Sequence, residues 1–182
     1  MTPYTHLHVH SQFSLLDGSG RLNELVDACY QQGMRALALT DHGVMYGIAD
    51  FFKEAKKRGV KPILGCEVYV APRDRRDKQV RSDKESAHLV LLARTPEGYR
   101  NLMQLVSIGF LEGFYYKPRI DYALLEEYAS GLVALSACLA GDIPRLLAQD
   151  RDAEAEALAQ RLSRMMGEDN FFIELQDHGM YE

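Results

Sequence analysis

Short apolar runs alternate with amphipathic segments along the whole chain. The runs place Leu, Val and Ala at consecutive positions, which is typical of strands buried on both faces. The segments between them repeat apolar residues about every three to four positions, which indicates helices. This pattern predicts strands at residues 4–10, 36–40, 60–70, 87–93, 131–138 and 171–176, and helices at 21–32, 46–58, 96–106, 122–128, 142–149 and 152–166.

Several residues at the ends of these segments are typical helix start and stop signals. Gly33 and Gly59 follow two predicted helices, where glycine readily adopts the left-handed conformation that ends a helix. Ser19 is a candidate N-cap for the first helix, Thr95 precedes a proline at the start of another, and Asp121 precedes the helix at 122–128.

The alternation of strands and helices predicts an α/β fold with parallel strands, in either a barrel or a doubly wound sheet. Most polar side chains with possible chemistry follow strand ends, which converge on one face in a barrel. His88 fits less well because it lies near the beginning of its strand. The mixed-charge segment 72–85 is expected to loop into solvent, with a contact to nucleic-acid phosphates as the alternative.

Composition narrows the class of protein without identifying a substrate. The 182 residues are 47% hydrophobic and 26% charged, which suits one ordinary globular core. A net charge of -5 gives no general attraction to nucleic acid. Three widely separated cysteines argue against a disulfide framework, and Cys29 and Cys66 are expected in the core. No run suits a membrane span or a signal peptide, so a cytoplasmic location is the default expectation.

Three histidines at alternate positions, His6, His8 and His10, would share one face of the first predicted strand. Imidazole is a common ligand of zinc, and two ligands on one strand can hold a single ion. Asp17, in the loop that follows, offers an oxygen ligand. The alternative is a surface strand of hydrogen-bonded histidines.

Further candidate ligands are spread along the chain: His42, Glu67, His88 and Cys138. Together with His8, His10 and Asp17 they exceed what one ion needs, which suits two or three divalent ions bridged by a carboxylate. Clustered ions suit phosphate ester hydrolysis because they activate water and stabilise both the attacking and the leaving oxygen.

These candidates form an ordered set of motifs that resembles the polymerase and histidinol phosphatase (PHP) family. Within the family, the set is most similar to the PHP domain at the N-terminus of bacterial replicative DNA polymerase III alpha subunits. The motifs are His8-Val9-His10, Thr40-Asp41-His42-Gly43, Gly65-Cys66-Glu67, His88 and Ser136-Ala137-Cys138, supported by residues 13–18, 109–119 and 174–179.

The resemblance implies a distorted seven-stranded β/α barrel that holds two to three divalent ions, zinc or manganese. His8 and His10 would hold one ion, which Glu67 would bridge to a second. His88 and Cys138 would complete the coordination of the second ion, while Asp17 and His42 would hold a third.

The family pattern has two further ligands, an Asp and a His, on a later strand that this sequence does not reach. We therefore expect residues 1–182 to be a single PHP domain, truncated at its C-terminal end, from a longer polymerase chain. Either the third ion and part of the first are then compromised, or His6, Asp41, His178 or water substitutes for the missing ligands. Asp41 is also a candidate to orient a ligating histidine. Arg119 or Lys117 is a candidate to meet phosphate, with a structural salt bridge as the alternative.

Three functions follow from the resemblance. The first is a metal-dependent 3'-5' exonuclease that acts on DNA within the parent polymerase, together with other replicase subunits. The second is a scaffold and interaction module that metals stabilise. The third is a small-molecule phosphatase of the histidinol phosphatase type, against which residues 114–119 and the apparent truncation argue.

Overall fold

The computed structural model describes residues 4–15, 17–79, 85–177 and 179. The helices are α1 (Leu22–Gln31), α2 (Ile48–Arg58), α3 (Pro96–Leu111), α4 (Tyr122–Glu127), α5 (Asp142–Leu147) and α6 (Asp152–Met166). The strands are β1 (Ala36–Leu39), β2 (Lys61–Val70), β3 (Ala87–Ala93), β4 (Arg119–Ile120), β5 (Leu132–Leu135) and β6 (Phe171–Phe172). Among these residues, no helix is long and apolar enough to cross a bilayer.

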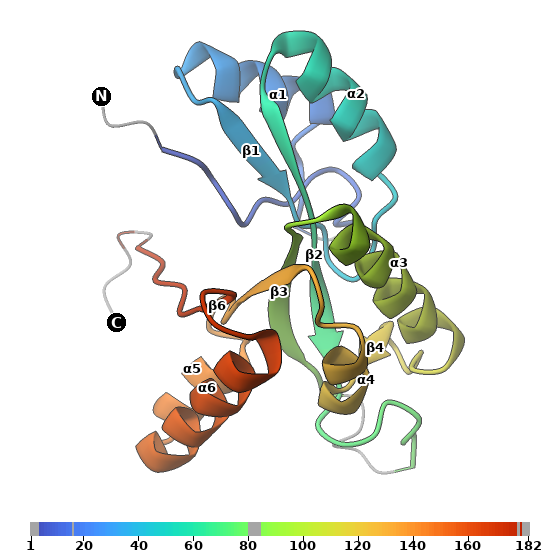
Figure 1. Ribbon diagram of the computed structural model, residues 1–182, viewed down its shortest axis with the longest axis vertical. Helices are drawn as coiled ribbons and strands as arrows, with labels where there is room; N and C mark the ends of the chain where they lie inside the picture. Colours follow the sequence, from blue (N-terminus) through green and yellow to red (C-terminus); the bar gives the residue numbers. More distant parts are fainter. Residues whose placement is uncertain (1–3, 16, 80–84, 178, 180–182) are drawn as a thin grey trace.

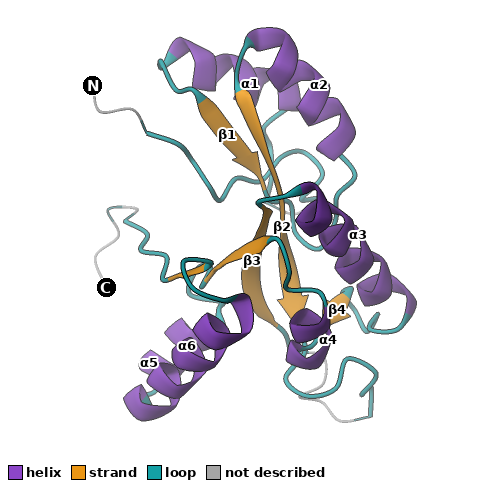
Figure 2. Cartoon of the chain, in the orientation of Figure 1, coloured by secondary structure: helices purple, strands orange, loops and turns teal. Residues whose placement is uncertain are grey.

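The strands form one open, six-stranded sheet in the order β1-β2-β3-β5-β6, with β4 beside β2. Figures 1 and 2 show α1 and α2 together at the end of the molecule that carries β1, and α5 and α6 at the opposite end. The mixed α/β class is thus as expected. The described residues do not form the expected closed, seven-stranded barrel.

The prediction of parallel strands was wrong at β3. This strand runs antiparallel to both β2 and β5, whereas β1, β4 and β6 each pair in parallel with a neighbour. The described residues between β2 and β3, 71–79 and 85–86, form no crossover helix, and the chain returns beside β2 in the opposite direction. Helix α3 then leads to β4, a two-residue strand that the sequence pattern does not predict.

Residues 6–10 do not form the predicted strand. They lie beside β1 with a bend at Leu7 and His8, and Ala38 donates its amide to the carbonyl of His6 while Thr40 donates to the carbonyl of Val9. Three residues of this segment therefore span two residues of the strand opposite. This mismatch breaks the regular ladder, so the simple alternation of faces does not hold across the three histidines.

Local signals at the helix ends are mostly confirmed. The Thr95 side chain accepts a hydrogen bond from the Gly98 amide at 3.0 Å, and Asp121 accepts one from the Leu124 amide. Gly59 ends α2 with φ of 78°. Ser19 was wrong as an N-cap, because α1 begins after Arg21 without a side-chain cap.

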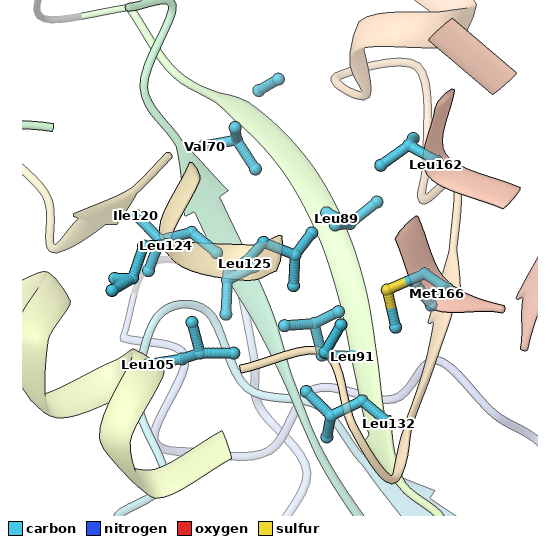
Figure 3. Close-up of a cluster of buried hydrophobic side chains, with 14 of the residues drawn as sticks. Val70, Leu89, Leu91, Leu105, Ile120, Leu124, Leu125, Leu132, Leu162 and Met166 are labelled. Atoms are coloured by element: carbon cyan, nitrogen blue, oxygen red, sulfur yellow. The ribbon is translucent and has the colours of Figure 1, made fainter. Parts of the chain in front are cut away.

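The main core lies where β2, β3 and β5 pack against helices. Figure 3 shows side chains from several elements meeting there, including Leu91 from β3, Leu105 from α3 and Met166 from α6. A second cluster joins α1, β1 and α2. Cys66 belongs to the first cluster and Cys29 to the second, as expected.

The segment 72–85 is only partly the solvent loop that its charge pattern predicts, and residues 80–84 lie outside the described residues. Arg75 is buried, with its guanidinium 3.1 Å from Asp121 and 2.6 Å from Glu112. These ion pairs tie the segment to α4 and to the end of α3.

Candidate metal centre

A buried carboxylate, Glu67 of β2, lies at the centre of the candidate site. One carboxylate oxygen, Oε1, lies 3.4 Å from His8 Nε2 and 3.0 Å from His88 Nδ1. The other, Oε2, lies 2.5 Å from His42 Nδ1 and 3.4 Å from His10 Nε2. Because Glu67 is fully buried, four imidazoles surround a carboxylate that water does not reach.

The sheet topology explains how four distant histidines meet. His8 and His10 come from the segment beside β1, and His42 follows β1 and bridges to Glu67. In the antiparallel pair of β2 and β3, Glu67 lies opposite Val90, two positions from His88 on the same face. The antiparallel direction of β3 therefore brings a histidine at the start of a strand to ligands that follow parallel strands.

The remaining two predicted ligands lie at the border of this cluster. Asp17 Oδ2 lies 2.7 Å from His42 Nε2, so His42 faces a carboxylate at each ring nitrogen. Cys138 Sγ lies 3.9 Å from His88 Nδ1 and 4.0 Å from Glu67 Oε1. All seven predicted ligand residues thus lie in one neighbourhood.

Asp41, expected to orient a histidine, touches the site through a serine. Its buried carboxylate accepts hydrogen bonds from the Ser11 amide and hydroxyl, at 2.6 and 2.8 Å, and from the Ser14 hydroxyl at 2.9 Å. Ser14 Oγ in turn lies 3.3 Å from His10 Nδ1. Asp41 therefore fixes the loop that carries His10.

Arg119 lies outside the cluster. Its fully buried guanidinium donates to the carbonyl oxygens of Gly113, Arg75 and Asp77 at 3.0, 2.9 and 3.0 Å. These contacts with backbone carbonyls favour a structural role over the expected contact with phosphate.

Lys117, by contrast, is exposed and close to the site. Its Nζ lies 4.3 Å from the centre of the Tyr69 ring. That ring stacks on His42 at 5.9 Å and meets His88 edge-on at 5.2 Å. A solvent-accessible cation therefore lies one aromatic ring away from the histidine cluster.

Of the two histidines proposed as substitute ligands, only His6 belongs to the described residues, and it is not in either group of converging donor atoms. His6 packs edge-on against Tyr4, with ring centres 4.8 Å apart, and His178 lies outside the described residues.

Electrostatic coupling dominates the site. Burial opposes the charged form of each group, yet the adjacent imidazoles of His42, His8 and His88 hold the pKa of Glu67 well below its usual range. Burial likewise lowers the pKa of His8, but the hydrogen bond to Glu174 and the adjacent Glu67 carboxylate outweigh it and raise the pKa to about 10.

The pKa shifts of His88, His10 and Cys138 differ because their neighbours differ. Burial lowers the pKa of His88, but hydrogen bonds to Cys138 and Glu67 raise it to about 9. Burial and the neighbouring His42 lower the pKa of His10, and the hydrogen bond to His88 lowers that of the Cys138 thiol. The carboxylate of Glu67 is thus surrounded by histidines of raised pKa and by one, His10, of lowered pKa.

The donor atoms suit divalent metal ions. Among the described residues, His8 Nε2, His42 Nδ1 and Glu67 Oε2 are buried without a hydrogen-bond partner, although they face one another. Two groups have donor atoms within 4.8 Å of each other: His8, His10 and Glu67, and His42, Glu67 and His88. Each group combines imidazole nitrogens with the Glu67 carboxylate, and such donors can hold a divalent ion, so Glu67 can be shared by two ions.

One residue at this site escaped the sequence reasoning. Glu174, two residues after β6, places Oε1 2.8 Å from His8 Nδ1. A charged residue directly after the apolar run 171–173 was the available signal. It showed a polar position at a strand end without indicating which side chain it would meet.

Comparison with known families identifies the class to which this fold and site belong. Residues 6–178 match the model of the PHP domain. The chain belongs to the PHP domain family, as its motifs predicted.

The more particular relatives are polymerases. The chain is 50% identical over 180 residues to DNA polymerase III subunit alpha of Treponema pallidum, covering 98% of this chain and 15% of that protein. It is 46% identical over 183 residues to the same subunit of Thermus aquaticus, covering 98% and 15%. The chain therefore spans about 15% of the length of these curated relatives.

A solved structure supports the fold. A two-domain protein from Bacteroides vulgatus, described as containing a predicted PHP-like metal-dependent phosphoesterase, superposes with a TM-score of 0.50 at 17% identity. The likeness covers 86% of this chain and 41% of that one.

Proposed function

We propose that this chain is the metal-binding PHP module of a bacterial replicative DNA polymerase and cleaves phosphodiester bonds at DNA 3' ends. The observation that carries the proposal is the buried Glu67 carboxylate surrounded by His8, His10, His42 and His88, several of whose donor atoms have no hydrogen-bond partner in the described part of the chain. Such a donor set has no evident structural use, because an apolar core would be more stable at this place.

The proposed ligand sets share Glu67. One ion would be held by His8, His10 and Glu67, and a second by Glu67, His88 and Cys138. His42 faces Glu67 with Nδ1 and Asp17 with Nε2, so it can join the second ion or hold a third with Asp17. Zinc or manganese suits these donors.

Bound divalent ions would supply an activated water and neutralise the charge that develops on phosphate oxygens. The chain's own residues would do the rest. Lys117, exposed above Tyr69, would meet a phosphate of the DNA backbone. Asp41 would hold the serine loop so that His10 keeps its orientation. DNA and other replicase subunits would reach the module through the parent polymerase.

Metal content provides the first test. The chain is purified without added metal and analysed for zinc and manganese, beside Glu67→Gln and the control Glu126→Gln, which removes the same charge from an exposed site. We expect about two or more equivalents in the wild type and the control, and a loss in Glu67→Gln. Circular dichroism checks that each variant is folded. The proposal would be contradicted by a folded wild type that carries no metal as purified and takes up none when zinc or manganese is added.

Cleavage provides the second test. A single-stranded oligonucleotide labelled at its 5' end is incubated with wild type, Glu67→Gln and Glu126→Gln in zinc and in manganese. Stepwise shortening from the 3' end that only Glu67→Gln loses would support exonuclease activity. Histidinol phosphate serves as a parallel substrate, and phosphate release from it alone would indicate the phosphatase instead.

A metal-stabilised scaffold is the second candidate. It is favoured by the fact that the donors come from four separate parts of the chain, so that bound ions would cross-link them. A chain that binds metal and gains thermal stability from it, but cleaves neither substrate, would have this function.

A further inference from the structure

Glu174 joins the last described strand to the metal centre. Its Oε1 lies 2.8 Å from His8 Nδ1, on the opposite side of the ring from Nε2, which faces Glu67 at 3.4 Å. Both side chains are largely buried, at 11% and 13% exposure. His8 is therefore held between two carboxylates, one from β2 and one from the segment after β6.

The Glu174 side chain is itself held in place. Its backbone amide donates to Ser136 Oγ at 2.9 Å, and Gln176 Nε2 donates to Glu174 Oε1 at 2.6 Å. Ser136 lies directly after β5, two residues before Cys138. The carboxylate that meets His8 is thus fixed by the same loop that carries another candidate ligand.

This geometry determines which nitrogen of His8 is free to bind metal. A carboxylate can only accept a hydrogen bond, so it requires the proton on Nδ1. In the neutral ring, Nε2 then carries the lone pair and faces Glu67. A ligating histidine commonly donates its other ring N–H to a carboxylate, which fixes the tautomer and the ring orientation.

We infer that Glu174 is a positioning residue for His8, a role that rests on the metal centre proposed above. It holds the Nδ1–H tautomer and aims Nε2 at the ion shared with His10 and Glu67. Glu174 is not itself a ligand in this arrangement, although its Oε2 is buried without a hydrogen-bond partner among the described residues.

Zinc titration of the purified chain, in competition with a chromophoric chelator, tests this role. We expect Glu174→Ala to weaken the site that contains His8 by about 10- to 100-fold. Glu174→Gln should stay close to wild type, because the amide oxygen still accepts from Nδ1–H. Asp177→Asn is the matched control, since it removes a charge from the same segment and Asp177 has no contact with His8 among the described residues.

The same titration separates the competing explanations. Equal losses in Glu174→Ala and Glu174→Gln would overturn the inference, because a direct ligand or a bare charge effect needs the carboxylate. Unchanged affinity in Glu174→Ala would overturn it and leave the metal centre intact. A wild type that binds no zinc would remove the proposed function together with this inference.

Nitrogen NMR of the zinc-loaded wild type gives a reading that does not depend on a variant folding. We expect His8 to show a protonated Nδ1 and a metal-bound Nε2. A metal-bound Nδ1 would overturn the inference even if zinc binds tightly.

Discussion

Replacing Arg119 with methionine separates a structural guanidinium from one that acts on substrate. Arg119 is fully buried and donates to three backbone carbonyls. Hydrogen bonds to a charged group contribute about 1.5–3 kcal/mol each, but their sum overstates the loss because burying the cation carries its own cost. Since removing one partner from a buried charged network typically costs about 3–5 kcal/mol, we expect Arg119→Met to destabilise the chain by about 4 kcal/mol.

Urea unfolding followed by circular dichroism measures this change. With a slope of about 2 kcal/mol per molar urea, the midpoint should fall by about 2 M. The matched control is Lys117→Met, because Lys117 is exposed and two residues away. Its free energy of unfolding should change by less than about 0.5 kcal/mol, as is usual for surface substitutions.

Cleavage activity per folded molecule should show the opposite order. Lys117→Met should lower DNA cleavage more than Arg119→Met, because only Lys117 lies beside the site and open to solvent. If Arg119→Met unfolded at the wild-type midpoint yet lost cleavage, the structural interpretation of Arg119 would be refuted. The guanidinium would then have to reach phosphate in some other conformation.

Three further changes test the frame of the site. Burial raises the pKa of Asp121, but hydrogen bonds from Arg75 and a helix amide outweigh this and lower the pKa. The Asp121 carboxylate therefore stabilises the fold above about pH 4, and this stabilisation is lost as the pH falls through the pKa of the folded state. Asp121→Asn should therefore lower the midpoint at pH 7 by more than at pH 3, and an equal loss at both would contradict this. Gly43→Ala should cost about 1–2 kcal/mol of stability and weaken zinc binding, because φ is 65° and a Cβ would lie 2.9 Å from the Tyr69 ring. Thermal melts and zinc titration measure the two effects, and wild-type values in both would show that the loop shifts to accommodate the methyl group. Asp41→Asn should cost about 1–3 kcal/mol and reduce zinc affinity, and tight binding by this variant would show that the serine loop does not need the carboxylate.

The parts of the fold that the sequence predicts well are those that local rules govern. Helix α6 has the bounds 152–166 that its apolar period indicates, and β3 matches its apolar run at 87–93. The caps at Thr95 and Asp121 depend on a few neighbouring residues, so the residue types suffice. The histidine spacing at residues 6–10 predicted one strand face with three histidines, but the segment is not a regular strand, and only His8 and His10 lie beside Glu67.

What the sequence could not predict depends on partners far away in the chain. The direction of β3 follows from how a long loop returns, and no periodicity within the strand records it. Glu174 meets His8 across 166 positions, and a lone glutamate after a strand has no signature that names its partner. Arg119 reads as a basic surface residue in a polar segment, although its contacts with carbonyls of two separate loops bury it.

The charges of the cluster show why protons and metal ions can replace one another there. Three histidines with raised pKa, His8, His42 and His88, face three carboxylates, Glu67, Glu174 and Asp17. With these histidines protonated, the ionic groups balance, which lets Glu67 stay charged although it is buried. A divalent ion must displace protons from the protonated nitrogens that it takes, so the release of protons offsets part of the positive charge that the ion brings. The same acidic residues that hold the imidazoles in place, Glu67, Glu174 and Asp17, thus favour cations at this site.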